Sequence, residues 1–376
     1  MFVRIWNAMT DLMILTFVRV AGVYEILDWT TMFRLISAYN KQRQLECGSI
    51  VHAVRTREVT VSVDRVRAFY LLLEVVGAGI LYRSRLEERE YHRFFMALLR
   101  WRSMSLCLLV DAGSSNSTGF PTWVPRWNRP GCTAWISENC IYETTDGGIY
   151  SHAKRHGLPL LHVDNTTLSV FGCFLDQVTC SIDVLKMDAP NADSGLVVAF
   201  LEWISRAQLL VNSQFLSSDE EFANVLKHIL PADTQDRPVP NNMTKSLRAW
   251  LGIMVGYSNE YLRSRKYSSP ALHSDDVFRI VDRIRQTSNA LTCHQALMEH
   301  FCGKMTLFIT RRSRMGAGSI GIENNDTIHR ISGVPVPMVL RKQGSAREYE
   351  VVCPAQISGK NHQRIWRYKF RRIDLV

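Results

Sequence analysis

The chain has 376 residues, of which 46% are hydrophobic, and its formal net charge is +10 with a pI near 9.2. This apolar content excludes a disordered tail, because disordered segments carry too few hydrophobic residues to form a core. At roughly 100 to 200 residues per domain, the length predicts two or three folded units. The positive charge permits contact with nucleic acid or an anionic membrane, but net charge alone does not define a binding face.

The first segment, residues 1–60, opens with an apolar run that Asp11 and Arg19 interrupt. The run is therefore shorter than the roughly 18 uncharged residues of a membrane span. Its apolar centre and its small-residue site are also poor for a secretory signal. The nine cysteines form no dense spacing pattern, as expected of reduced thiols. We therefore expect a cytoplasmic protein without a membrane-spanning segment.

The second segment, residues 61–130, is predicted to hold two helices and a loop. Between residues 86 and 101, apolar side chains recur at helical spacing and charged side chains fill the other face, which predicts one buried stripe. Gly, Ser, Asn and Pro are frequent over residues 111–130, so the helices are expected to end there. The loop contains the sequence Phe120-Pro-Thr-Trp-Val-Pro-Arg-Trp127.

The third and fourth segments are predicted to be a mixed region at 131–190 and a helical region at 191–302. Within the mixed region, residues 167–171 alternate like a strand with one buried face. Within the helical region, the spacing of Ser217 and Glu220 predicts a helix start. Ser274, followed by two aspartates, predicts another.

The last segment, residues 303–376, is predicted to be a small antiparallel β-sheet or barrel, because short β-like runs alternate there with Gly, Asn and Pro. The expected strands are residues 307–310, 327–332, 338–341, 348–352 and 365–371. Taken together, the segments predict an α+β fold whose N-terminal and central parts are helical.

The string Gly316-Ala-Gly-Ser-Ile-Gly321 fits the G-x-G-x-x-G pattern of dinucleotide-binding loops. Such a loop must lead into a helix whose N-terminus holds the pyrophosphate, and another strand is expected here instead. Glycines with positive φ in a turn between two strands explain the string more simply. We therefore predict no cofactor.

Other reactive residues form no recognisable site. A zinc site could be imagined from Cys132, Cys140, His152 and His156, but the two cysteines are too far apart in sequence for a structural zinc site. A second loose cluster consists of Cys293, His294, His300 and Cys302, where buried thiols on a helix are the simpler interpretation. Ser319 lacks the first glycine of a nucleophile elbow. A cysteine–histidine pair brought together by folding stays open. The sequence predicts no metal and no catalytic residue.

The basic run at 360–372 interleaves Lys and Arg with Trp366, Tyr368 and Phe370, residue types that neutralise phosphates and stack on bases. On a strand the two kinds would lie on opposite faces, and burial of the rings is then the simpler interpretation. A basic module that binds nucleic acid or anionic lipid through the C-terminal sheet is kept as the alternative function.

Several motifs resemble segments of the fungal heterokaryon incompatibility (HET) family. Phe2-Val-Arg4-Ile-Trp6 is similar to F-x-R-x-W near the end of its HET domain, and residues 63–73, with Asp64 and Tyr70, are similar to D-x-R-D-x-V-Y-A-L-L-G. The loop at 120–127 is similar to L-P-S-W-V-P-D-W. Arg67 and Glu74 depart from the second of these patterns.

Further motifs of the same resemblance follow towards the C-terminus. Residues 168–178 are similar to L-x-V-x-G-x-x-x-D-x-I, and residues 307–310 to R-F-F-x-T. Residues 316–321, 325–333 and 337–341 are similar to the closing G-x-G-x-x-P, G-D-x-V-x-x-x-x-G and P-F-V-L-R series. The resemblance thus covers most of the chain in scattered motifs.

The resemblance implies an intracellular, non-enzymatic regulatory or scaffold region with an unidentified protein partner, acting in non-self recognition and programmed cell death. It also implies that residues 1–60 are the end of a HET domain and that the chain is truncated. The residues at motif positions are expected to be structural, since proline fixes φ and indoles bury large areas. These are Phe2, Arg4, Trp6, Asp64, Tyr70, Trp123, Pro125, Trp127, Gly333 and Arg341.

Overall fold

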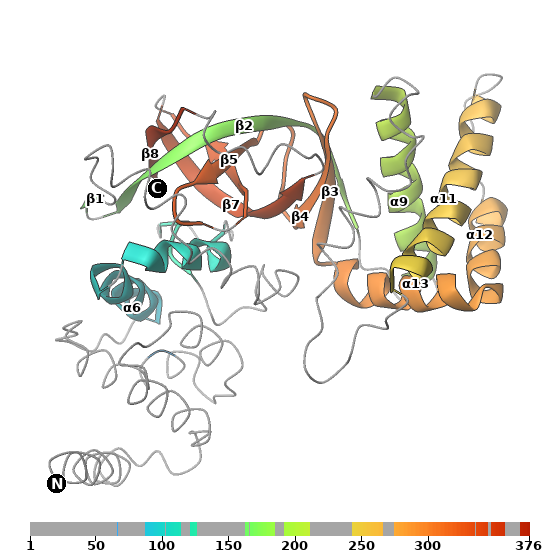
Figure 1. Ribbon diagram of the computed structural model, residues 1–376, viewed down its shortest axis with the longest axis horizontal. Helices are drawn as coiled ribbons and strands as arrows, with labels where there is room; N and C mark the ends of the chain where they lie inside the picture. The colour runs from blue at the N-terminus through green and yellow to red at the C-terminus, as the bar shows by residue number, and fades with distance from the viewer. Residues whose placement is uncertain are drawn as a thin grey trace, which may run out of the picture.

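The structure is a computed structural model. It describes residues 66, 87–101, 103–113, 121–125, 162–164, 166–184, 192–210, 243–265, 274–334, 336–344, 347–357 and 369–376. A β-barrel occupies the centre, with helices beside it and below it (Figure 1). The α+β class expected from the sequence is confirmed.

Within the described residues, the strands form one sheet of eight, six of which close into the ring of the barrel. The strands are β1 (His162–Asp164), β2 (Thr167–Asp183), β3 (Met305–Thr310), β4 (Met315–Ser319), β5 (Thr327–Ile331), β6 (Met338–Lys342), β7 (Glu348–Ile357) and β8 (Arg371–Leu375). Neighbours follow the order β1-β2-β3-β4-β7-β6-β5, and β5 also pairs with β2, which closes the ring. The β7–β8 pair is parallel, and the other pairs are antiparallel.

Strand β2 closes the ring because it changes partners along its 17 residues. Its first part pairs with β8 up to Gly172, its middle part pairs with β5, and its end pairs with β3 from Val178 onwards. A register shift between Phe174 and Asp176 interrupts the pairing with β5. Such bulges bend a strand and increase its twist, which is what curvature around a small barrel requires.

The core has two parts. One cluster comes from the strands and the β4–β5 turn alone: Cys173, Leu175, Val178, Phe308, Ile322, Ile328, Val339, Val352, Cys353, Ala355 and Ile357. The other cluster joins the remaining strand residues to the helices. The barrel is therefore buried on more than one face, and its strands carry apolar residues on both sides.

The helical lobe consists of α9 (Ala192–Leu210), α11 (Met243–Arg265), α12 (Ser274–Gln286) and α13 (Ser288–Phe301), and it lies between β2 and β3 in the chain. The buried rings of Trp203 and Trp250 meet the ring of Phe200 edge-on, at centroid distances of 5.8 and 4.9 Å. Trp203 Nε1 also donates to Phe308 O on β3 at 3.1 Å, which attaches the lobe to the barrel.

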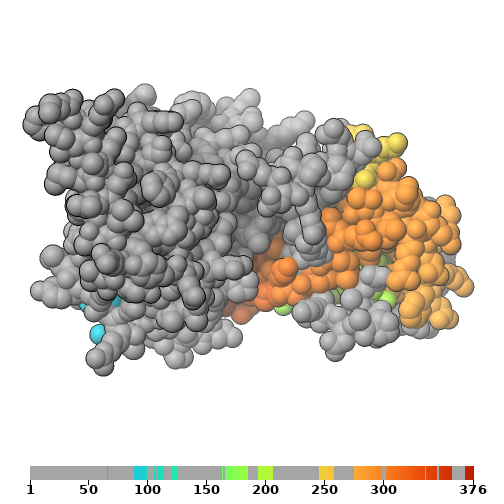
Figure 2. Space-filling view, turned by 90° about the horizontal axis from the view of Figure 1, so that it is seen from below, coloured from blue at the N-terminus to red at the C-terminus, as the bar shows by residue number. Residues whose placement is uncertain are grey.

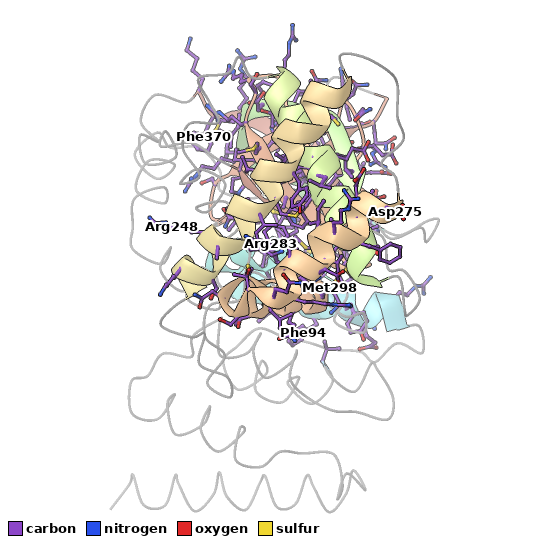
Figure 3. All side chains as sticks on the ribbon, turned by 90° about the vertical axis from the view of Figure 1, so that its right-hand side faces the viewer. Phe94, Arg248, Asp275, Arg283, Met298 and Phe370 are labelled. Atoms are coloured by element: carbon purple, nitrogen blue, oxygen red, sulfur yellow. The ribbon has the colours of Figure 1, made fainter. Side chains whose placement is uncertain are left out.

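Helix α12 shows why the lobe folds where the sequence predicts. The apolar residues Val277, Ile280, Val281 and Ile284 are buried at helical spacing. Asp275 lies in the first turn and Arg283 in the last, so both charges favour the helix dipole. Figure 3 looks onto this lobe, with Asp275 and Arg283 on α12. In the view from below, the orange residues of the lobe adjoin the darker orange residues that follow them in the chain (Figure 2).

Two further elements lie below the barrel, α6 (Glu87–Trp101) and the 3₁₀ helix η1 (Ser103–Asp111) (Figure 1). Helix α6 buries Tyr91, Phe94, Phe95 and Leu98, the stripe expected from the sequence. Element η1 buries a nearly continuous apolar run, Leu106 and Leu108–Val110, and contacts β7. Together they cover one side of the barrel.

Most predicted elements within the described residues are confirmed. Helices α6 and α12 and strands β3, β5, β6 and β7 lie at the expected positions, and the strand at 167–171 is the start of β2. The strand expected at 365–371 differs, because β8 begins only at Arg371, where its pairing with β2 begins. Residues 358–368, the helix expected after Ser217 and nearly all of the helix expected before residue 76 lie outside the described residues.

The prediction that the glycines of residues 316–321 lie in a turn is wrong for the first two. Gly316 and Gly318 lie inside strand β4, and only Gly321 has a positive φ, of 104°, in the following turn. A Cβ on Gly316 would overlap the ring of Phe308 and lie 2.6 Å from Gln356 O. The first two glycines are thus required by close packing in the barrel and not by a turn conformation. The turn leads to β5, the strand that the sequence predicts after the string.

The packing around Gly316 can be tested by urea unfolding. Gly316→Ala is expected to lower the free energy of unfolding by about 1–3 kcal/mol, because an added methyl group in a filled core displaces its neighbours. Gly252→Ala on α11 is the control, since nothing lies within 4 Å of its added Cβ. The free energy of unfolding of that variant is expected to rise by up to about 1 kcal/mol, because alanine favours helices. Equal stability of the Gly316→Ala protein and wild type would contradict the packing described.

Candidate functional site

The Trp loop, defined as residues 121–125, fastens the end of the barrel. Thr122 Oγ1 donates to Val376 O at 2.5 Å and accepts a hydrogen bond from Val351 N at 2.8 Å. Thr122 N also donates to Val376 O, at 3.1 Å. One threonine therefore holds strand β7 and the residue after β8 together.

Trp123 connects the Trp loop to α6 and to the residue before β2. Its side chain is fully buried, and its Nε1 donates to Thr166 O, just before β2, at 2.9 Å. Its ring lies 5.3 Å from the ring of His92 and 6.0 Å from that of Phe95, both on α6. Pro125, two residues on, is also buried. The indole thus fills the space between α6 and the barrel while its polar atom is satisfied.

Gly333 and Arg341 lie near opposite ends of the β5–β6 hairpin. Gly333 has a φ of 84°, and a Cβ there would come within 3.3 Å of Leu106 on η1. Both the backbone conformation and the close approach favour glycine. Arg341 lies on β6, beyond the residues that pair with β5.

Arg341 binds Asp326 through two parallel hydrogen bonds. Its Nε and Nη2 donate to the two carboxylate oxygens of Asp326, each at 2.9 Å. Nη2 also donates to Gly321 O at 2.7 Å, and Nη1 lies 2.9 Å from Glu323 Oε1. Asp326 is buried, and its bond raises the pKa of Arg341 above the usual value. This bidentate pair holds the β4–β5 turn against β6.

A second buried carboxylate, Asp176, holds the β3–β4 turn. Its Oδ2 accepts from Thr310 Oγ1 at 2.8 Å, and its Oδ1 accepts from Gln177 N at 2.9 Å and from Arg312 N at 3.3 Å. Arg314 Nε lies 3.9 Å from Oδ2. Asp176 and Asp326 fall within the motif ranges 168–178 and 325–333, but neither was predicted as a site residue. The available signals were an acid inside an apolar strand for Asp176, and a position directly before a predicted strand for Asp326.

Four predicted motif residues thus lie in the described part: Trp123, Pro125, Gly333 and Arg341. The first two belong to the Trp loop, and the other two fix turns of the barrel. The remaining six lie outside the described residues: Phe2, Arg4, Trp6, Asp64, Tyr70 and Trp127. The structure brings the Trp loop, β7 and the residue after β8 together but keeps Arg341 apart, at the β4–β5 turn.

His329 is a further buried titratable group of the barrel wall. It is 4% exposed, and within the described part of the chain neither ring nitrogen has a hydrogen-bond partner. Its ring lies 5.7 Å from that of Phe174 and 5.1 Å from that of Tyr349. Burial lowers the pKa of His329 to about 4, so the ring is neutral near pH 7. His329 therefore contributes no charge to the barrel wall at neutral pH.

The cysteine and histidine groups do not form a metal centre in the part of the chain that the structure describes. Cys293 is fully buried on α13, and burial raises the pKa of its thiol to about 12. His294 accepts a hydrogen bond from Trp250 Nε1 at 3.3 Å. The group from Cys132 to His156 lies outside the described residues. Ser319 is buried in β4.

Two further findings concern membrane-spanning helices and similarity to known proteins. Among the described helices, none combines the length and the apolar character needed to cross a membrane. Comparison with protein-family models, curated proteins and solved structures finds no match to this chain.

The Arg341–Asp326 pair is tested by removing one partner or both. Arg341→Met leaves the buried carboxylate of Asp326 unpaired and is expected to lower the free energy of unfolding by roughly 3 kcal/mol. Glu323→Gln is the control. Because this side chain is 67% exposed, the substitution is expected to change stability by less than about 1 kcal/mol.

Adding Asp326→Asn to Arg341→Met removes the unpaired charge. The double variant is therefore expected to be more stable than the Arg341→Met protein, as measured by the midpoint of urea unfolding. If Arg341→Met changes stability no more than Glu323→Gln does, the pair does not hold the turn.

Proposed function

We propose that this chain is a non-enzymatic regulatory or scaffold region of a fungal heterokaryon incompatibility protein. It acts in non-self recognition and programmed cell death, through contacts with a protein partner in the cytoplasm. The family assignment rests on the motif resemblance, and the geometry of those motifs supports the role given to them.

The observation that carries the proposal is that side chains from separate motifs bind one another. Asp326 and Arg341 come from two motifs of the resemblance, and they form the bidentate pair of the β4–β5 turn. Asp176 and Thr310 come from two others and hydrogen-bond at 2.8 Å. These residues build a framework. A framework of this kind presents surfaces to a partner and needs no reacting group of its own.

The state of the described thiols also supports a role without turnover. A nucleophilic cysteine needs a lowered pKa and access to solvent. Burial instead raises the pKa of Cys173, as it does that of Cys293. Both side chains are buried. They are therefore used as small apolar groups within the core.

The proposal is tested by deleting the gene in the fungal strain that carries it and fusing the deletion strain with incompatible testers. Fewer dying fusion cells are expected with at least one tester, counted by uptake of a vital dye. Wild-type and Gly252→Ala genes are expected to restore death. Trp123→Ala is expected to fail, because it removes the indole between α6 and the barrel.

Unchanged fusion-cell death with every tester would refute a role in incompatibility. The non-enzymatic part is checked separately with broad probes for nucleophilic serine and cysteine residues. No labelling is expected of the folded protein. Labelling that a competing substrate analogue blocks would identify an enzyme instead.

A further inference from the structure

The basic turn is defined as residues 311–314 between β3 and β4. It carries two arginines whose side chains do not hold the fold together. Arg311 and Arg312 are exposed, and neither guanidinium has a partner among the described residues. Arg314, in contrast, reaches back to Asp176. The chain as a whole has a net charge of +10. Two unpaired positive charges at the tip of a hairpin attract anions.

The backbone of this turn is held rigidly. Arg311 N donates to Gln177 O at 2.7 Å, and Arg312 N donates to the buried Asp176 Oδ1. Ser313 has a φ of 57°, a conformation that residues other than glycine seldom adopt. Strained backbone persists where the surrounding structure enforces it, and such positions cluster at binding sites. The arginines are thus presented by a preformed turn.

An exposed aromatic ring lies on β2, three residues before the strand position that binds the basic turn. Phe174 is 50% exposed although it lies in the middle of β2. It precedes Gln177, which accepts the bond from Arg311, by three residues, or about 10 Å of strand. The ring of His329 supports Phe174 edge-on at 5.7 Å. Since His329 is neutral near pH 7, it places no charge beneath the ring of Phe174.

We propose that Arg311, Arg312 and Phe174 form a binding surface for single-stranded nucleic acid. The two guanidiniums contact phosphates, and the phenylalanine ring stacks on an unpaired base. This combination of cations along a groove or turn with an aromatic platform is how barrels bind single strands without sequence preference. The inference is independent of the proposed incompatibility role and rests on these three side chains.

Single strands fit this surface better than other polyanions. A duplex keeps its bases stacked inside, so the ring of Phe174 would gain nothing from it. An anionic bilayer would meet the arginines but offers no aromatic face for the ring of Phe174 to stack on. A single strand offers phosphates to the arginines and unpaired bases to the ring.

The test uses the full chain and a fluorescent 12-nucleotide single strand of mixed sequence, with binding followed by anisotropy over a range of NaCl concentrations. Wild type is expected to bind more weakly as salt rises. Arg311→Gln with Arg312→Gln is expected to weaken binding by roughly tenfold or more and to reduce the salt slope by about 1.4, or 0.7 per phosphate contact. Phe174→Ala is expected to weaken binding by roughly fivefold or more without changing the slope.

The helical lobe offers matched controls. Phe278 is 53% exposed on α12, and Arg283 is exposed on the same helix (Figure 3). Phe278→Ala and Arg283→Gln are expected to leave affinity within about twofold of wild type. The corresponding duplex is expected to bind less tightly than the single strand. Circular dichroism melting verifies that every variant is folded.

Several results would overturn the proposal. Wild type could fail to bind the single strand even at 50 mM NaCl. The lobe variants could weaken binding as much as the barrel variants. Binding would then depend on the overall net charge and not on the proposed surface. Equal affinity for the duplex would remove the stacking role of Phe174. Binding to phosphatidylserine vesicles, with no binding to the oligonucleotide, would assign the surface to a membrane instead.

Discussion

The indole of Trp123 is the point at which three distant parts of the chain meet. Its ring packs against α6, and its nitrogen binds the residue before β2. The adjacent Thr122 binds β7 and Val376. Strand β8 pairs with β2 and, over only two residues, with β7. The Trp loop therefore supplies the support that strand pairing alone does not give to this end of the barrel.

The buried charges of the barrel also hold separate elements together. Asp176 and Asp326 are both buried, and each accepts hydrogen bonds from a backbone N–H of a turn and from a side chain of another strand. A buried carboxylate is tolerated only when it is paired in this way. Both carboxylates are thus engaged in holding turns of the barrel. Arg311 and Phe174, in contrast, are exposed on the surface.

The sequence predicted elements whose signal is local. Helices α6 and α12 and the short strands after residue 303 follow from periodicity and turn residues. The sequence did not predict that β2 would extend to Asp183, change partners and enclose the strands that follow the helical lobe, because such pairing depends on residues far apart in the chain. Gly316 was assigned to a turn for the same reason: the ring of Phe308 that excludes its side chain lies on a neighbouring strand. Motif positions such as Arg341 were identified, but not their partners.

The Trp loop couples α6 to the barrel. Hydrogen exchange of the wild-type and Trp123→Ala proteins, read peptide by peptide alongside urea unfolding, tests it most directly. Loss of a buried tryptophan is expected to remove about 3–5 kcal/mol of stability. Protection should fall together in α6, in β8 and at the start of β2, and much less in α11 and α13. If β8 keeps its protection while only α6 loses it, the loop does not join the two.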